Sequence, residues 1–263
     1  MTDKEHTYAL LGGVTITRKN VRNTHVYEIE GDERVKGLVL PSVTTVLNMV
    51  AKPALVAWAE RQAISATLRA SRDLVGSDGD TEDRARMILK SEGEERMNAG
   101  NIMHEALLSY ADGMTKLEDM TEDFRPTAEV FEVWLSDRGA TVTHVECAVY
   151  DPDELVGGTL DIAGTMGDGT SFIGDLKSSS NVYPEHVAQV AGYEAAAAAC
   201  LPGFVSPARC FVFLAGPDGR FEPHELTATE VTNGQRLLRS ALDMYKAHAG
   251  LRKAIRERER GEA

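Results

Sequence analysis

Residues Gly157 to Ser178, GGTLDIAGTMGDGTSFIGDLKS, decide how this chain is expected to fold. The stretches Gly157–Met166 and Thr170–Ser178 have the composition of strands, and Gly167-Asp168-Gly169 between them is typical of a tight turn. This pattern predicts two antiparallel strands joined by a tight turn. Asp161 on one strand and Asp175 on the other can then lie near each other across the pair.

The second strand also predicts a place for Lys177. Side chains of a strand alternate between its faces, so Asp175 and Lys177 point the same way. Hard divalent cations prefer carboxylate oxygens, usually one or two of them together with water and a substrate phosphate. The arrangement suits phosphodiester hydrolysis, in which a metal activates a water and the lysine holds that water or stabilises developing charge. Taken alone, Asp175-Leu176-Lys177 favours the alternative, a solvated strand end, so further motifs must support the hydrolysis interpretation.

Outward from this pair of strands, the pattern predicts one further strand upstream and a mixed region downstream. Thr141–Tyr150 should be the first strand of a β-meander, and Pro184 opens a helix through the alanine run to Cys200. Ala208–Leu214 and Phe221–Leu226 form a second hairpin, and an amphipathic helix covers about Ala228–Arg258.

The chain before the strands is expected to be mostly helical. Apolar periodicity predicts helices over Leu55–Leu68, from about Glu82 past His104 to Tyr110, and over Pro126–Arg138. In the last of these, Val130, Val133 and Trp134 are predicted to share one apolar face. Trp58 and Trp134 are expected to pack in the core rather than to stack on bases. Ser71–Asp83 should be a loop, and residues 7–40 a small β-hairpin region.

Four separated motifs support the chemical interpretation because they stand in a fixed order. They are Gly100-Asn101-Ile102-Met103-His104, Gly158-Thr159-Leu160-Asp161, Asp175-Leu176-Lys177-Ser178 and Gln189-Val190-Ala191-Gly192-Tyr193. This series resembles the PD-(D/E)xK nuclease superfamily, and within it the RecB-like branch. The resemblance covers roughly residues 95–225. Pro41–Leu47, with Lys52-Pro53 and Trp58-Ala59, also looks like the N-terminal region of phage-encoded exonucleases of this branch.

The resemblance implies an α/β fold with a restriction-endonuclease-like core, in which helices flank a mixed central sheet in the order αβββαβ. An N-terminal accessory region, a hairpin plus a helix over residues 1–80, would precede the nuclease core and C-terminal helix of residues 81–263. It implies that His104, Asp161 and Asp175 bind Mg²⁺ or Mn²⁺ with the backbone carbonyl of Leu176, and that Lys177 is the catalytic lysine. Gln189 and Tyr193, one helical turn apart, would line the site.

The chain also departs from the family pattern. Leu160 stands where the family name has proline, as is common in this branch. The cysteine set of the iron–sulfur relatives is missing, since Cys147, Cys200 and Cys210 have no C-x-x-C spacing, so no cluster is expected and the thiols should be reduced and buried. No helicase motif accompanies the nuclease motifs, so a stand-alone enzyme is expected.

Composition sets the remaining expectations. The polar N-terminus and the absence of a long apolar run predict a cytoplasmic protein without a membrane span. The net charge of −13 disfavours a nucleic-acid partner at long range, although a bound metal would supply positive charge locally. Two basic strips are candidates for DNA contact, and both can equally be solvated faces. They are Arg18, Lys19 and Arg22, and the C-terminal set Arg236, Arg239, Lys246, Arg252, Lys253 and Arg256.

Several assignments stay open at the level of sequence. Glu146 either joins the acidic site or is an exposed strand carboxylate, and Ser178 either contacts a phosphate or caps a strand end. His144, His186 and His224 are expected to be structural or on the surface. The leading interpretation is a DNA exonuclease of phage type in recombination or DNA processing, with room for a recombination partner protein. The alternatives are a catalytically silent DNA-binding scaffold and an endonuclease of the same superfamily.

Overall fold

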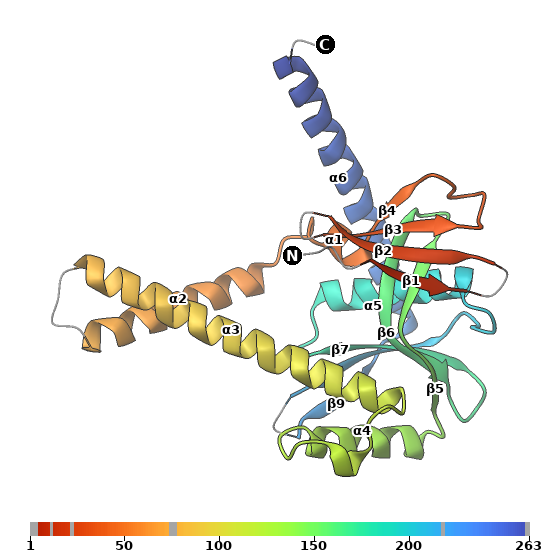
Figure 1. Ribbon diagram of the computed structural model, residues 1–263, viewed down its shortest axis with the longest axis horizontal. Helices are drawn as coiled ribbons and strands as arrows, with labels where there is room; N and C mark the ends of the chain where they lie inside the picture. Colours follow the sequence, from red (N-terminus) through yellow and green to blue (C-terminus); the bar gives the residue numbers. More distant parts are fainter. Residues whose placement is uncertain (1–4, 11–12, 22–23, 74–77, 217–218, 261–263) are drawn as a thin grey trace. The chain divides into compact units, whose positions relative to one another are not determined.

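The computed structural model describes residues 5–10, 13–21, 24–73, 78–216 and 219–260. The chain divides into two compact units. The first comprises Met1–Val50 and Ala106–Ala263, and the second Ala51–Glu105. The fold is α/β, with one antiparallel and one mixed sheet in the first unit (Figure 1).

The mixed sheet has five strands in the order β5-β6-β7-β8-β9. These are Thr141–Asp151, Val156–Thr165, Ser171–Lys177, Arg209–Ala215 and Phe221–Glu225. Strands β5, β6 and β7 form the predicted meander, β8 pairs parallel to β7, and β9 pairs antiparallel to β8. The parallel step requires a crossover, which helix α5 (Pro184–Cys200) supplies.

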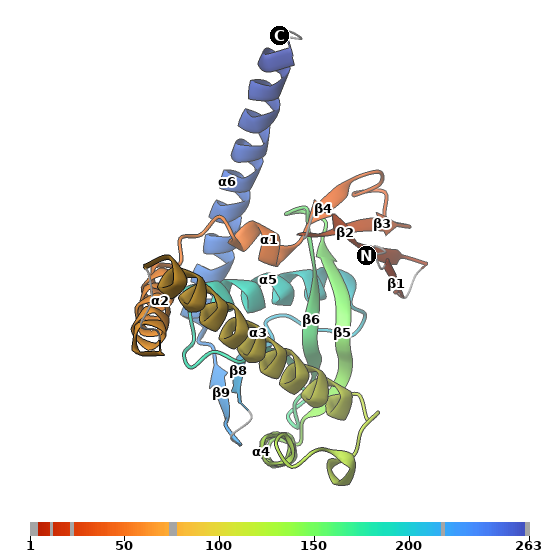
Figure 2. The same ribbon diagram turned by 60° about the vertical axis from the view of Figure 1, so that its left-hand side comes forward.

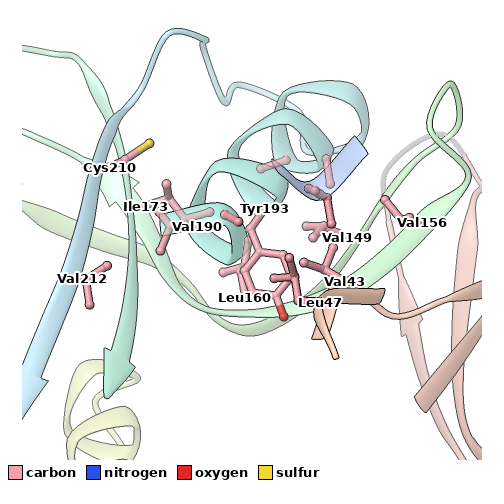
Figure 3. Packing of buried hydrophobic residues seen from close by; sticks show 14 of the residues in the cluster. Val43, Leu47, Val149, Val156, Leu160, Ile173, Val190, Tyr193, Cys210 and Val212 are labelled. Atoms are coloured by element: carbon pink, nitrogen blue, oxygen red, sulfur yellow. The ribbon is translucent and has the colours of Figure 1, made fainter. Parts of the chain in front are cut away.

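Helices cover the two faces of this sheet. Helix α5 contacts β5 to β8 and also packs against α6 (Ala228–Arg260). The core between α5 and the sheet includes Leu160, Ile173, Val190 and Val212 around Tyr193 (Figure 3). Helix α4 (Arg125–Asp137) packs on the other face through an aromatic cluster, in which Trp134 contacts Phe172, Phe211 and Phe213. Figure 2 shows α4 and α5 on opposite sides of the sheet.

The buried face of α4 agrees with the prediction at Trp134 and differs from it at Val130 and Val133. Phe131 and Trp134 are buried, as are Thr127 and Ala128, whereas Val130 and Val133 are exposed. The apolar periodicity of the helix admits either face, and the aromatic side chains of the sheet select the one that carries the larger rings.

The three cysteines are free thiols in the first unit. Cys210 is buried as predicted, whereas Cys147 and Cys200 are only half-buried. Burial raises the pKa of each thiol above its usual value, so all three stay protonated near neutral pH.

The N-terminal part of the first unit is larger than the expected hairpin. Strands β1 (His6–Ala9), β2 (Thr15–Val21), β3 (Thr24–Glu30) and β4 (Val39–Pro41) form a four-stranded antiparallel sheet. The short helix α1 (Val43–Leu47) follows, with Ser42 as its N-cap. Tyr27 joins this sheet to the mixed one, because a side chain at Gly157 would come within 2.7 Å of its ring.

The second unit consists of α2 (Pro53–Asp73) and most of α3 (Asp78–Ala111). The loop predicted over Ser71–Asp83 is wrong for the described part, since residues 71–73 and 78–83 are helical, while 74–77 lie outside the described residues. Trp58 is 41% exposed rather than buried, with the guanidinium of Arg96 over its ring. Among the residues that the structure describes, none of the helices combines the length and apolar character needed to cross a membrane.

Candidate active site

The turn between β6 and β7 sets the register of the two acidic strands. Asp168 accepts hydrogen bonds from the backbone N of Thr170 (2.9 Å) and from its hydroxyl (2.6 Å), and Gly169 takes the left-handed φ of 85° that the turn requires. The register then runs from Thr165 opposite Ser171 to Ile162 opposite Gly174. The next step along both strands brings Asp161 across from Asp175, as the sequence predicted.

Hydrogen bonds fix both carboxylates. Asp161 Oδ2 accepts from the backbone N of Leu176 at 2.7 Å, so the carboxylate on β6 reaches across to β7. Asp175 is buried, and its Oδ1 accepts from Gln189 Nε2 at 2.8 Å. Its Oδ2 forms an ion pair with Lys177 Nζ. The structure therefore brings Asp175, Leu176 and Lys177, at the end of β7, together with Asp161 in the middle of β6.

Lys177 is charged in this environment. Burial by itself lowers the pKa of its ammonium, but the negative charges of Asp175 and Asp161 outweigh that effect and leave the pKa above its usual value. The side chain as a whole is 23% exposed. It supplies a fixed positive charge beside two carboxylates.

Helix α5 contributes the other two predicted residues. Gln189 Nε2 lies 2.8 Å from Asp175 and 3.4 Å from the hydroxyl of Tyr193, one turn further along the same helix face. Burial raises the pKa of Tyr193 well above its usual value, and the nearby charge of Asp175 adds to this, so the phenol stays neutral. Gln189 thus links the tyrosine to the acidic pair.

The glycine of the Gly158-Thr159-Leu160-Asp161 motif has a packing role. A Cβ at Gly158 would lie 2.2 Å from the ring of Tyr193, which is too close for any side chain. The ring therefore rests on the bare backbone of β6, three residues before Asp161.

His104 lies on α3, in the second unit, and its side chain is half-buried. Its role as a metal ligand stays a prediction, as does that of the Leu176 carbonyl. Glu146 lies on β5 between the pairs Val145–Ile162 and Cys147–Leu160, so the register places it across from Asp161. Its side chain is exposed, and its left-handed φ of 45° marks an irregularity in the strand.

The remaining polar candidates have local roles. Ser178 is exposed, and its carbonyl accepts from Arg220 Nη2 at 3.4 Å. His186 Nδ1 accepts from the backbone N of Tyr183 at the start of α5, and His144 contacts the hydroxyl of Thr143. His224 is a surface residue beside Glu222.

Two residues near the site were missed at the level of sequence. Arg220, in the connection between β8 and β9, donates to the carbonyls of Ser179 (3.1 Å) and Ser178, and so holds the segment after Lys177. Thr159, two residues before Asp161, contacts Tyr27 and Arg18 of the N-terminal sheet. Both contacts join segments at least 41 residues apart, and no local spacing signals them.

The two basic strips have different surroundings. Lys19 pairs with Glu28, while Arg18 contacts Thr159, and Arg22 lies outside the described residues. In the C-terminal strip, Arg239 pairs with Glu154 and Lys253 lies 3.7 Å from Glu257. Part of each strip is therefore engaged with carboxylates of this chain.

In comparisons with known proteins, no family model matches the chain and no curated protein gives a match.

Proposed function

We propose that the protein is a metal-dependent DNA nuclease of the PD-(D/E)xK type, with the RecB-like motif set, that acts as an exonuclease. The observation that carries the proposal is the convergence of Asp161, Asp175 and Lys177 on adjacent strands, with Leu176 and Gln189 bound to the two carboxylates. The strand order β5-β6-β7, the crossover α5 and the parallel strand β8 support a restriction-endonuclease-like core.

The donor set fits a hard divalent cation. Asp161 and Asp175 offer two carboxylates from neighbouring strands. Mg²⁺ is usually bound by one or two carboxylates of a protein. Among the described residues there is no group of three or more His, Cys, Asp or Glu side chains that could hold a metal ion. Water and substrate oxygens would complete the coordination, as is usual for Mg²⁺. When bound, the ion would activate water and neutralise charge on the phosphate.

The protein groups have separate tasks in this proposal. Asp161 and Asp175 would hold the cation, and the bonds from Leu176 N and Gln189 Nε2 keep the carboxylates oriented. Lys177 would place its positive charge beside the phosphate oxygens and stabilise the charge that develops there. Tyr193 stays neutral and supports Gln189.

The test compares wild type with Asp175→Ala and Lys177→Ala on end-labelled linear DNA and on circular DNA. Reactions contain Mg²⁺ or Mn²⁺, with and without chelator. Both variants should lose at least about a hundredfold in rate, as expected for removal of a key electrostatic group. Lys36→Ala is the matched control, because Lys36 is an exposed lysine that pairs with Glu33 on the surface.

Equal rates in wild type and Lys177→Ala would remove the assigned site. A folded wild-type protein that binds DNA and shows no metal-dependent cleavage would favour the silent scaffold instead. Cleavage of circular DNA would indicate an endonuclease.

A further inference from the structure

One face of the N-terminal sheet changes from apolar to cationic along its length. Ile16 on β2 is buried in a cluster with Tyr27 and Ile29 of β3. Arg18 is two residues further along β2, so it lies on the same face, directly opposite Tyr27 in the register. The guanidinium is therefore directed to the side on which this sheet packs.

The guanidinium of Arg18 contacts the hydroxyl of Thr159 in the mixed sheet. Arg18 Nη1 lies 3.5 Å from Thr159 Oγ1, and the hydroxyl of Tyr27 lies 3.0 Å from the same oxygen. Thr159 and Asp161 are two residues apart on β6, about 7 Å along the strand and on one face. Arg18 therefore contacts β6 two residues before Asp161, although it comes from a separate sheet.

Arg18 differs from its neighbour Lys19 in its partners. Lys19 pairs with Glu28 at 2.8 Å and with Glu5 at 3.8 Å. Arg18 is half-buried, and within the described part of the chain its side chain has a hydroxyl partner but no carboxylate partner. A partly desolvated guanidinium is best stabilised by an anion, so this position is suited to an anionic ligand.

We propose that Arg18, oriented by Thr159 and Tyr27, binds a phosphate of the nucleic-acid strand next to the phosphate at Asp161 and Asp175. The inference rests on the proposed nuclease function and adds a substrate-binding group to it. The planar guanidinium can take two phosphate oxygens at once, which fixes the position of the strand as well as its charge.

The test measures DNA binding rather than cleavage. Labelled DNA is titrated with wild type, Arg18→Ala and Lys19→Ala by fluorescence anisotropy in calcium chloride, at several salt concentrations, after checking that the DNA stays intact. Arg18→Ala should weaken binding by about tenfold or more. The slope of log affinity against log salt concentration should become less steep by about one unit, which is the contribution of one phosphate contact. Lys19→Ala, which removes the same charge, should bind like wild type.

A purely structural role for Arg18 would lower the melting temperature and leave the salt slope unchanged, and that result would overturn the inference. If Arg18→Ala fails to fold, Arg18→Lys is measured instead. This variant keeps the charge, so it should keep the salt slope of wild type and lose part of the affinity for DNA. Binding with wild-type affinity would contradict the role of the guanidinium. If wild type neither binds nor cleaves DNA, the proposed function fails too. If wild type cleaves DNA while Arg18→Ala and Lys19→Ala bind equally well, only this inference fails.

Discussion

Gly158 shows how single residues join the acidic strand to helix α5. The ring of Tyr193 occupies the space that a Cβ at this position would need. Tyr193 in turn contacts Gln189, which binds Asp175. A change at Gly158 should therefore affect both the packing of the core and the orientation of the site.

We expect Gly158→Ala to lower the free energy of unfolding by about 1–3 kcal/mol, because the buried ring has little room to move. Urea denaturation followed by circular dichroism measures the effect. Gly250→Ala is the matched control. Gly250 lies in helix α6, and a Cβ there would meet nothing within 4 Å, so alanine should raise stability by about 0.5–1 kcal/mol. Equal stabilities of the two variants would contradict the packing argument.

Asp32 gives the first unit a pH-dependent contact. Its carboxylate accepts hydrogen bonds from Arg34 and from the hydroxyl of Tyr150 at 2.8 Å. The bonds from Arg34 are the main reason that the pKa of Asp32 lies well below its usual value, and the bond from Tyr150 contributes less. A lowered pKa means that this contact stabilises the fold above about pH 4 and is lost as the pH falls through the native pKa.

Asp32→Asn should therefore be less stable than wild type at pH 7, by about 1–3 kcal/mol for a hydrogen bond to a charged group. The difference should shrink progressively below about pH 4. Urea denaturation of both proteins, at a series of pH values from strongly acidic to neutral, checks this. A difference that stays constant over that range would show that the charge of Asp32 does not matter.

Helix α4 is held to the mixed sheet by its aromatic side chains. Trp134 is 4% exposed and contacts Phe131 of its own helix and four phenylalanine rings of the sheet, Phe172, Phe211, Phe213 and Phe221. Each such ring pair contributes stabilisation beyond that of the apolar area that the ring buries. The exposed Val133, one residue earlier, offers an internal comparison.

Trp134→Ala should lower the free energy of unfolding by about 3–5 kcal/mol, as large-to-small changes of buried aromatic residues do. Val133→Ala should change it by no more than about 0.5 kcal/mol. Chemical denaturation followed by far-ultraviolet circular dichroism measures both. A loss for Val133→Ala comparable to that for Trp134→Ala would show that the face predicted from the sequence, which carries both side chains, is the buried one.

The two units differ in the size of the apolar side chains that they bury. The first unit has an extended core on both faces of the mixed sheet. The described cluster of the second unit consists of Ala66, Ala70 and Ala85, with Ile88 and Leu89 packed against it. Small side chains remove little apolar area from water, so the second unit should be locally less stable.

Hydrogen exchange followed by mass spectrometry tests this difference. Peptides from α2 should exchange at least about tenfold faster than peptides from β7 and α5, because local opening of α2 requires less free energy. Protection of α2 equal to that of β7 would show that the units open together.

Much of the fold was predictable because its signals are local. The turn at Gly167-Asp168-Gly169, the proline at Pro184 and the alternation of the strands act over a few residues. The predicted meander, the helix that begins at Pro184 and the second hairpin are confirmed. The spacing of Asp175 and Lys177 likewise predicted that they share a face, and their ion pair bears this out.

Local signals do not distinguish between two faces of a helix that carry similar apolar side chains. Local signals did specify the order of the elements from β5 to α6 and the residues that meet across the acidic strands, since hairpin register depends on a turn and a period of two. The folded chain alone shows which face of α4 is buried, that Trp58 is exposed, and that Arg18 reaches Thr159. Each of these depends on contacts between residues distant in the chain, which no periodicity encodes.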